Sequence, residues 1–143
     1  MNLPLQKRIV LADDHPDLLH QVREMLTANF QIVETVTDGA ALIEAVRSHS
    51  PDMVIADIRI PRISGIEACR SILQLGLCDA VILLTMYNDQ QFVHDALEAG
   101  IRGYVLKIDA GDELIPAVTS VLSGSQYLSR GVLKAVQTQG NSD

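Results

Sequence analysis

The sequence predicts an α/β fold in which a parallel β-sheet is covered by helices on both faces. Short apolar runs alternate along the chain with longer stretches whose apolar residues recur at helical spacing. The short runs are apolar at successive positions, as in strands that are buried on both faces. Strict alternation of strand and helix is typical of a parallel sheet sandwiched between helices.

Length and composition indicate one soluble domain. The 143 residues are enough to bury a core but too few for two domains. Apolar residues make up 48% and charged residues 20%, which argues against a disordered chain. The net charge of −7 would repel a phosphate backbone, so we expect this chain alone not to bind DNA or RNA.

The sequence shows no sign of export or membrane insertion. Residues 1–7 contain no long apolar stretch, and no apolar run reaches the roughly 18 residues of a membrane span. Cys69 and Cys78 lack metal-type pairing, which indicates reduced thiols in a protein core. We therefore expect a cytoplasmic protein that does not contact a membrane.

Five strands, each followed by a helix, are expected before residue 123. The strands are Arg8–Ala12, Gln31–Val36, Met53–Asp57, Ala80–Thr85 and Gly103–Lys107. The helices run from Pro16 to about Ala28, along the apolar stripe Ala41–Val46, and over Gly65–Leu75, Asp89–Ala99 and Asp112–Leu122. Asp38 is a candidate helix cap, and Ser50-Pro51 should stop the second helix. This pattern does not fix the order of the strands in the sheet.

Polar residues stand at the carboxyl ends of four of these strands. Asp13 and Asp14 follow the first strand, Asp57 ends the third, Thr85 the fourth and Lys107 the fifth. Each residue alone has an ordinary explanation, as a cap, a strand end or a solvated surface group. In a parallel sheet, however, these ends share one edge, where functional sites lie. The conjunction therefore predicts a single site.

The residue types in this set suit phosphoryl chemistry. Three neighbouring carboxylates repel one another unless a cation joins them, and oxygen ligands favour Mg²⁺. Lys107 adds a positive charge for an anion, and Thr85 adds a hydroxyl donor. A carboxylate such as Asp57, held by Mg²⁺ and flanked by these groups, is suited to attack phosphorus.

The chain resembles the receiver domains of bacterial two-component response regulators. The resemblance is carried by Leu11–Pro16, Asp57–Gly65, Leu84-Thr85 and Gly103–Lys107, and it extends over most of the chain. It implies a flavodoxin-like, three-layer αβα sandwich whose five-stranded parallel sheet has the order 2-1-3-4-5. It also implies a signalling domain and not an enzyme, catalysing only its own phosphotransfer and dephosphorylation.

The resemblance assigns roles to the site residues. Asp57 would take the phosphoryl group from the histidine of a sensor kinase. Asp14 and Asp57 would bind Mg²⁺, with Asp13 assisting and the backbone carbonyl of Arg59 as a further ligand. Lys107 would pair with the phosphoryl group.

The resemblance also implies a switch formed by Thr85 and Tyr104. Thr85 would move toward the phosphoryl group and let Tyr104 rotate inward. Successive residues of a strand alternate faces, so Tyr104 should point away from Lys107, against the helix that begins near Asp89. Receivers often pair through the fourth helix, fifth strand and fifth helix, so a homodimer formed on phosphorylation is a candidate assembly.

The subtype resembles the LuxR-type transcriptional regulators, through Asp13–Pro16, Leu84–Tyr87, Gly103–Lys107 and Gly124–Ser129. We expect residues 1–123 to form the receiver and residues 124–143 a linker or extra helix leading toward an effector domain. The roughly 20 residues after Leu122 are too few for a DNA-binding domain with its own core, so DNA would be bound only through a domain absent from this chain. The alternative is a stand-alone receiver that acts by protein–protein binding.

Two residues depart from the pattern of many receivers. Ile108 follows the site lysine where a proline is common, and Met86 is bulky where many receivers have a small residue. LuxR-type members often carry methionine there, so Met86 is consistent with the subtype. His15 lies beside the acidic pair and would tune it.

Three other functions fit the sequence less well. An aspartate-based Mg²⁺ phosphatase typically needs a second acid two residues after the nucleophile, where this chain has Arg59. A flavin-binding module needs a phosphate-cradling loop after the first strand, where Asp13-Asp14 would repel the phosphate. A receiver that binds its partner without phosphorylation remains an alternative.

Overall fold

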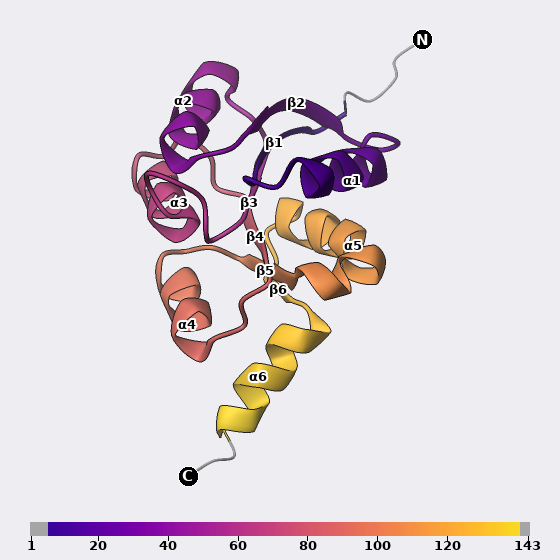
Figure 1. Ribbon diagram of the computed structural model, residues 1–143, viewed down its shortest axis with the longest axis vertical. Coiled ribbons are helices and arrows are strands. Elements are labelled where there is room, and N and C mark those ends of the chain that lie inside the picture. The colour runs from indigo at the N-terminus through magenta and orange to yellow at the C-terminus, as the bar shows by residue number, and fades with distance from the viewer. Residues whose placement is uncertain (1–5, 141–143) are drawn as a thin grey trace.

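A six-stranded parallel sheet forms the centre of the computed structural model, which describes residues 6–140 (Figure 1). The strands are β1 (Arg8–Ala12), β2 (Gln31–Val36), β3 (Met53–Ala56), β4 (Val81–Thr85), β5 (Gly103–Leu106) and β6 (Tyr127–Leu128). Their order is β2-β1-β3-β4-β5-β6. The predicted order of the first five strands is thus confirmed. The prediction of only five strands is wrong, because β6 pairs in parallel with β5. Its two residues are too few to show a period.

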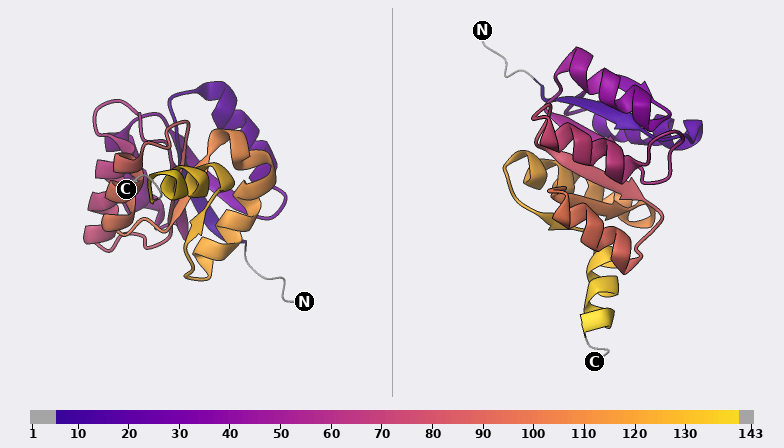
Figure 2. Two further views of the ribbon diagram at one scale, coloured as in Figure 1. Left: turned by 90° about the horizontal axis from the view of Figure 1, so that it is seen from below. Right: turned by 90° about the vertical axis from the view of Figure 1, so that its left-hand side faces the viewer.

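Helices cover both faces of the sheet, which confirms the flavodoxin-like sandwich. α1 (Pro16–Leu26) and α5 (Ala110–Leu122) lie on one face, and α2 (Gly39–His49), α3 (Gly65–Gln74) and α4 (Gln90–Glu98) on the other (Figures 1 and 2). α6 (Arg130–Gly140) follows β6 and extends beyond that edge of the sheet. Within the described residues, no helix is both long and apolar enough to span a bilayer.

The continuous apolar strands fill two cores, one on each face of the sheet. Every residue of β3, β4 and β5 is buried. Along β1, Ile9 and Leu11 belong to the core under α1 and α5, whereas Val10 and Ala12 belong to the core under α2, α3 and α4. Burial on both faces explains why these strands do not alternate polar with apolar residues.

Short-range signals set the beginning of several helices. The Asp38 carboxylate accepts a hydrogen bond from the Ala41 N–H at 2.8 Å, so Asp38 caps α2 as predicted. Ser64 caps α3 in the same way. At Gly65 a Cβ atom would collide with the backbone carbonyl of Asp57. Glycine therefore lets α3 begin directly against the end of β3, and this fixes the loop that follows Asp57.

The structure corrects some predicted boundaries. β3 ends at Ala56, so Asp57 is the first residue beyond the strand. β5 ends at Leu106, and Lys107 instead begins a short 3₁₀ helix, η1 (Lys107–Asp109), that leads into α5 two residues earlier than predicted. Other ends differ by a few residues. In the segment predicted as a linker or extra helix, residues 127–140 form β6 and α6, while residues 141–143 lie outside the described part of the chain.

Candidate functional site

Two buried carboxylates lie side by side beyond the ends of neighbouring strands. Asp13 follows β1 and Asp57 follows β3, with exposed fractions of 4% and 3%. Their backbone amides continue the hydrogen bonding of the sheet: the Asp13 N–H donates to the Val36 carbonyl at 3.0 Å, and the Asp57 N–H to the Ala12 carbonyl at 2.9 Å. The sheet thus fixes where both side chains start.

Lys107 joins these two acids. Its Nζ atom lies 2.9 Å from Oδ2 of Asp13 and 2.9 Å from Oδ2 of Asp57. Burial lowers the pKa of the Lys107 ammonium, but the hydrogen bonds and negative charges of Asp57 and Asp13 outweigh this effect, so the pKa is raised overall. Lys107 is therefore a cation at neutral pH. Oδ1 of Asp57 accepts a hydrogen bond from the Ile58 N–H at 2.7 Å.

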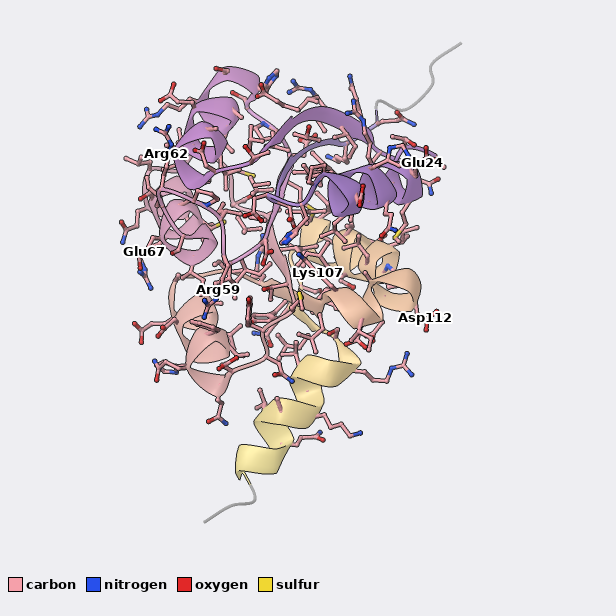
Figure 3. The ribbon with its side chains drawn as sticks, in the orientation of Figure 1. Glu24, Arg59, Arg62, Glu67, Lys107 and Asp112 are labelled. Carbon is pink, nitrogen blue, oxygen red and sulfur yellow. The ribbon has the colours of Figure 1, made fainter. Side chains whose placement is uncertain are left out.

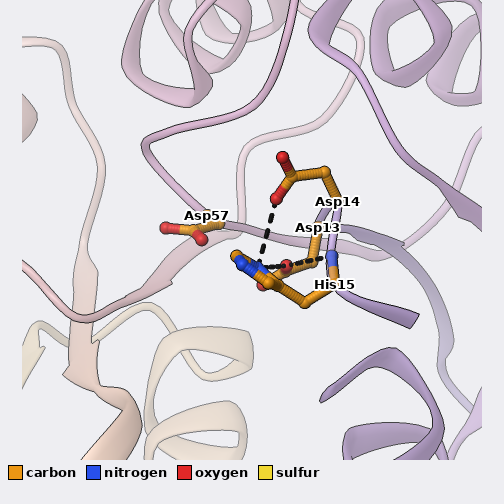
Figure 4. Close-up of side chains that lie close together, drawn as sticks. All are labelled: Asp13, Asp14, His15 and Asp57. Carbon is orange, nitrogen blue, oxygen red and sulfur yellow. Dashed lines mark hydrogen bonds and ion pairs between the residues drawn. The ribbon is translucent and has the colours of Figure 1, made fainter. Parts of the chain in front are cut away.

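Asp14 and His15 complete an acidic cluster (Figure 4). One ligand atom from each of Asp13, Asp14, His15 and Asp57 lies within 4.8 Å of the others. Nδ1 of His15 is 2.9 Å from Oδ1 of Asp13 and 3.2 Å from Oδ1 of Asp14. The cluster offers mainly carboxylate oxygens, which is the donor chemistry of a site for a hard divalent cation. The three carboxylates named from the sequence therefore do converge.

Thr85 and Tyr104 both form hydrogen bonds with the backbone of Tyr87. Thr85 is fully buried at the end of β4, and its hydroxyl accepts a hydrogen bond from the Tyr87 N–H at 3.4 Å. Tyr104 is also fully buried, and its hydroxyl donates to the Tyr87 carbonyl oxygen. Burial raises the pKa of the Tyr104 phenol well above its ordinary value. As expected, the Tyr104 ring lies on the α4 side of the sheet, but it is already buried in that core, so it has the inward position that the resemblance assigns to the switched state.

Arg59 directs its side chain toward the same tyrosine. The guanidinium carbon lies 4.6 Å from the centre of the Tyr87 ring, which also meets Phe92 edge to face. In Figure 3, Arg59 lies beside α4 and Lys107 nearer the centre of the molecule. Sequence reasoning did not single out Tyr87, although it belongs to the Leu84–Tyr87 motif. A backbone carbonyl acceptor has no signature in the sequence.

The two residues that depart from many receivers are both exposed. Met86 follows Thr85, and Ile108 follows Lys107, with 88% of Ile108 accessible to solvent. Because Thr85 and Leu106 are partners in the β4–β5 register, both residues lie just beyond the same edge of the sheet. The exposure of Met86 shows that its side chain is directed to solvent and does not fill the acidic site.

Comparisons with known proteins all indicate the same family. The family model of the response regulator receiver domain matches residues 9–119 of this chain. The transcriptional regulatory protein DegU of Brevibacillus brevis is 33% identical over 85% of this chain and 52% of its own length. The chemotaxis protein CheY of Bacillus subtilis is 30% identical over 81% of this chain and 98% of its own length.

A solved structure shares the fold over nearly the whole chain. The two-component response regulator of the LuxR family from Aurantimonas superposes with a TM-score of 0.88 and is 29% identical, covering 95% of this chain and 99% of that one. The chain spans about half the length of the curated transcriptional relatives: 52% of DegU and 57% of NreC.

The acidic cluster of Asp13, Asp14 and Asp57 is typical of the receiver site that binds a metal ion. The chain therefore belongs to the response regulator receiver domain family.

Proposed function

We propose that Asp57 is the phosphoryl acceptor of this receiver. The observation that carries the proposal is the contact of one ammonium, that of Lys107, with both Asp57 and Asp13 in a nearly buried site. An oxygen of the Asp57 carboxylate attacks phosphorus, the bond from phosphorus to the donor atom breaks, and an acyl phosphate forms. Lys107 remains protonated and pairs with the charge on the transferred phosphoryl oxygens.

The oxygen ligands fit Mg²⁺, and we assign it to Asp13, Asp14 and Asp57, with the backbone carbonyl of Arg59 as a further ligand. When bound, Mg²⁺ supplies positive charge that stabilises the phosphoryl oxygens during transfer. His15 bridges Asp13 and Asp14, so it orients two of the three carboxylates. The position where an aspartate-based phosphatase carries its second acid is occupied here by Arg59, whose guanidinium lies over the Tyr87 ring.

Thr85 and Tyr104 form the proposed switch, joined through Tyr87. The Tyr87 N–H is bonded to Thr85, and the Tyr87 carbonyl to Tyr104. A movement of Thr85 toward a phosphoryl group on Asp57 removes one of these bonds and shifts the start of the loop between β4 and α4. The contact with Tyr104 transmits that shift to β5.

The partners follow from this role. A sensor histidine kinase supplies the phosphoryl group to this receiver, which we place in the cytoplasm, and phosphorylation favours a homodimer. The family and the DegU-type relatives support control of transcription through a LuxR-type DNA-binding domain outside this chain. A stand-alone receiver that acts by protein–protein binding is the second candidate, because the chain spans 98% of the chemotaxis relative.

Beryllofluoride, a phosphoryl mimic, tests the site without a kinase. Calorimetric titration of the protein with beryllofluoride should give saturable binding that requires Mg²⁺. Asp57→Asn should abolish this binding. Asp79→Asn, an exposed acid at the other edge of the sheet, is the matched control and should bind as the wild type does. Equal binding by wild type and Asp57→Asn would refute the proposal.

A further inference from the structure

A set of hydrogen bonds joins the start of α6 to the turn that carries the site lysine. Oδ2 of Asp109 accepts the Ser129 hydroxyl at 2.7 Å and the Gly131 N–H at 2.9 Å. The Ser129 hydroxyl also accepts the Leu106 N–H at 3.1 Å, and Ser129 is fully buried. The beginning of α6 is thus bonded both to the last residue of β5 and to the last residue of η1.

Glu113 of α5 strengthens this attachment. Its carboxylate accepts the Arg130 N–H at 3.1 and 3.2 Å and the Tyr127 hydroxyl at 2.9 Å. The free N–H groups in the first turn of a helix favour carboxylates. Here the acids come from η1 and α5, not from α6 itself. α6 therefore receives its N-terminal cap from the body of the receiver.

Close packing leaves α6 little freedom to slide. A Cβ atom on Gly131 would collide with the side chain of Leu106 and come within 3.0 Å of Oδ2 of Asp109. The next residue, Val132, is fully buried in the core that also contains Tyr104. The Ser129 N–H donates to the Tyr104 carbonyl at 3.0 Å. The docked position of α6 is therefore narrowly defined.

The turn η1 is held at both ends. Lys107, its first residue, contacts Asp13 and Asp57 in the acidic site, and Asp109, its third residue, holds the start of α6. Ile108 lies between them and is almost fully exposed, so packing of its side chain does not fix the turn. The contacts at the two ends of η1 restrain it instead.

We propose that Asp109 is a positioning residue for Lys107. Its hydrogen bonds to Ser129 and Gly131 hold η1 so that Lys107 can pair with a phosphoryl group on Asp57. In return, a phosphoryl group bound at the acidic site strengthens the docking of α6. This inference rests on the proposed function. Phosphoryl binding at the acidic site and docking of α6 both require η1 to be ordered. Whichever occurs first therefore lowers the entropic cost of the other. Such coupling is reciprocal. Residues 127–131 lie outside the part matched by the family model.

The test measures both ends of η1. Beryllofluoride affinity in the presence of Mg²⁺ is measured by calorimetry, and amide hydrogen exchange is followed at residues 130–137. In wild type, saturation with beryllofluoride should slow exchange at Gly131 and Val132. Asp109→Ala should speed this exchange and weaken beryllofluoride binding by about fivefold, the lower end of the range for a coupling between two sites.

Two variants separate positioning from a general loss of charge. Asp109→Asn should recover most of the affinity, because both bonds are made to one oxygen that an amide carbonyl can replace. Asp112→Ala removes an exposed acid from the first turn of α5 and should bind beryllofluoride as wild type does (Figure 3). The same affinity loss in Asp112→Ala and Asp109→Ala would overturn the specific role of Asp109.

The decisive contrary result is an Asp109→Ala protein with a loosened α6 and unchanged beryllofluoride affinity, because Asp109 would then be only a helix cap. If Asp109→Ala does not fold, Gly131→Ala perturbs the same contact from the side of α6 and must also weaken binding. Unchanged affinity in that variant would equally overturn the inference. A wild-type protein that binds no beryllofluoride would instead refute the proposed function itself.

Discussion

The ammonium of Lys107 lies 2.9 Å from a carboxylate oxygen of Asp57, although 50 positions separate the two residues along the chain. The same ammonium lies 2.9 Å from Asp13. Both carboxylates are buried, so one cation stabilises two acids at the edge of the sheet. This arrangement has consequences for stability as well as for phosphoryl transfer.

Loss of the lysine should destabilise the fold. Lys107→Met leaves two buried carboxylates without their cation, and we expect the free energy of unfolding to fall by about 3 kcal/mol at neutral pH without Mg²⁺. Urea unfolding measures the change. Lys7→Met, which removes an exposed cation, should be close to wild type. If the two variants are equally stable, the ion pairs contribute nothing to the fold.

The advantage of wild type over Lys107→Met should depend on pH. The pKa of Lys107 is raised above the ordinary value of 10.5 in the folded protein. The stabilisation is therefore fully present below pH 10.5 and is lost as pH rises through the folded-state pKa. Unfolding measured from pH 8 upward should show a constant difference that shrinks only at strongly alkaline pH. A decrease already between pH 8 and 9 would contradict the raised pKa.

Mg²⁺ should stabilise the protein through the acidic cluster. At a free concentration ten times the dissociation constant, binding to the folded state alone adds about 1.4 kcal/mol. Chelation should reverse the gain, and Asp14→Asn should remove most of it. Asp17→Asn, in the first turn of α1, is the control and should retain the gain. A thermal shift that is the same in both variants would place the cation elsewhere.

The hydroxyl of Tyr104 should contribute to stability through Tyr87. Tyr104→Phe keeps the buried ring but leaves the Tyr87 carbonyl without this donor, so we expect a loss of about 1 kcal/mol in urea unfolding. The chemical shift of the carbonyl carbon of Tyr87 should change at the same time. Wild-type stability together with an unchanged Tyr87 signal would show that the bond is absent in solution.

The two thiols should be unreactive until the protein unfolds. Cys69 is fully buried, and burial raises its pKa to about 12, while the pKa of Cys78 is raised by the same cause. Alkylation at pH 8 should be slow in the native protein and complete in denaturant. Because the unfolded thiol ionises first, Cys69 also lowers stability as pH rises above 9.0. Rapid alkylation of both thiols in the native state would contradict their burial.

The sequence predicted the acidic site better than it predicted the chain end. The strand pattern predicted that three residues lie close together, because parallel strands end at one edge of the sheet. These residues are in contact in the structure: Lys107 with Asp13 and with Asp57. The sixth strand has two residues and no detectable period. Its pairing with β5 depends on tertiary contacts.

The hydrogen bonds of Tyr87 and Asp109 could not be predicted from the sequence, because they also depend on tertiary contacts. Tyr104 uses a backbone carbonyl of Tyr87, which any residue could provide. Asp109 was not distinguished from other acids near the start of α5, and its hydrogen-bonding partners lie about 20 residues further along the chain. Side-chain contacts between distant loops follow from the packing of the elements, which alternating strands and helices do not specify.

Covalent phosphorylation of Asp57 tests the central claim most directly. The protein is incubated with acetyl phosphate and Mg²⁺, the acyl phosphate is reduced with borohydride, and the modified residue is located by peptide mass spectrometry. We predict one modified position, residue 57, with no modification when Mg²⁺ is chelated and none in Asp57→Asn. Modification of another aspartate in wild type, or undiminished phosphorylation of Asp57→Asn, would contradict the account.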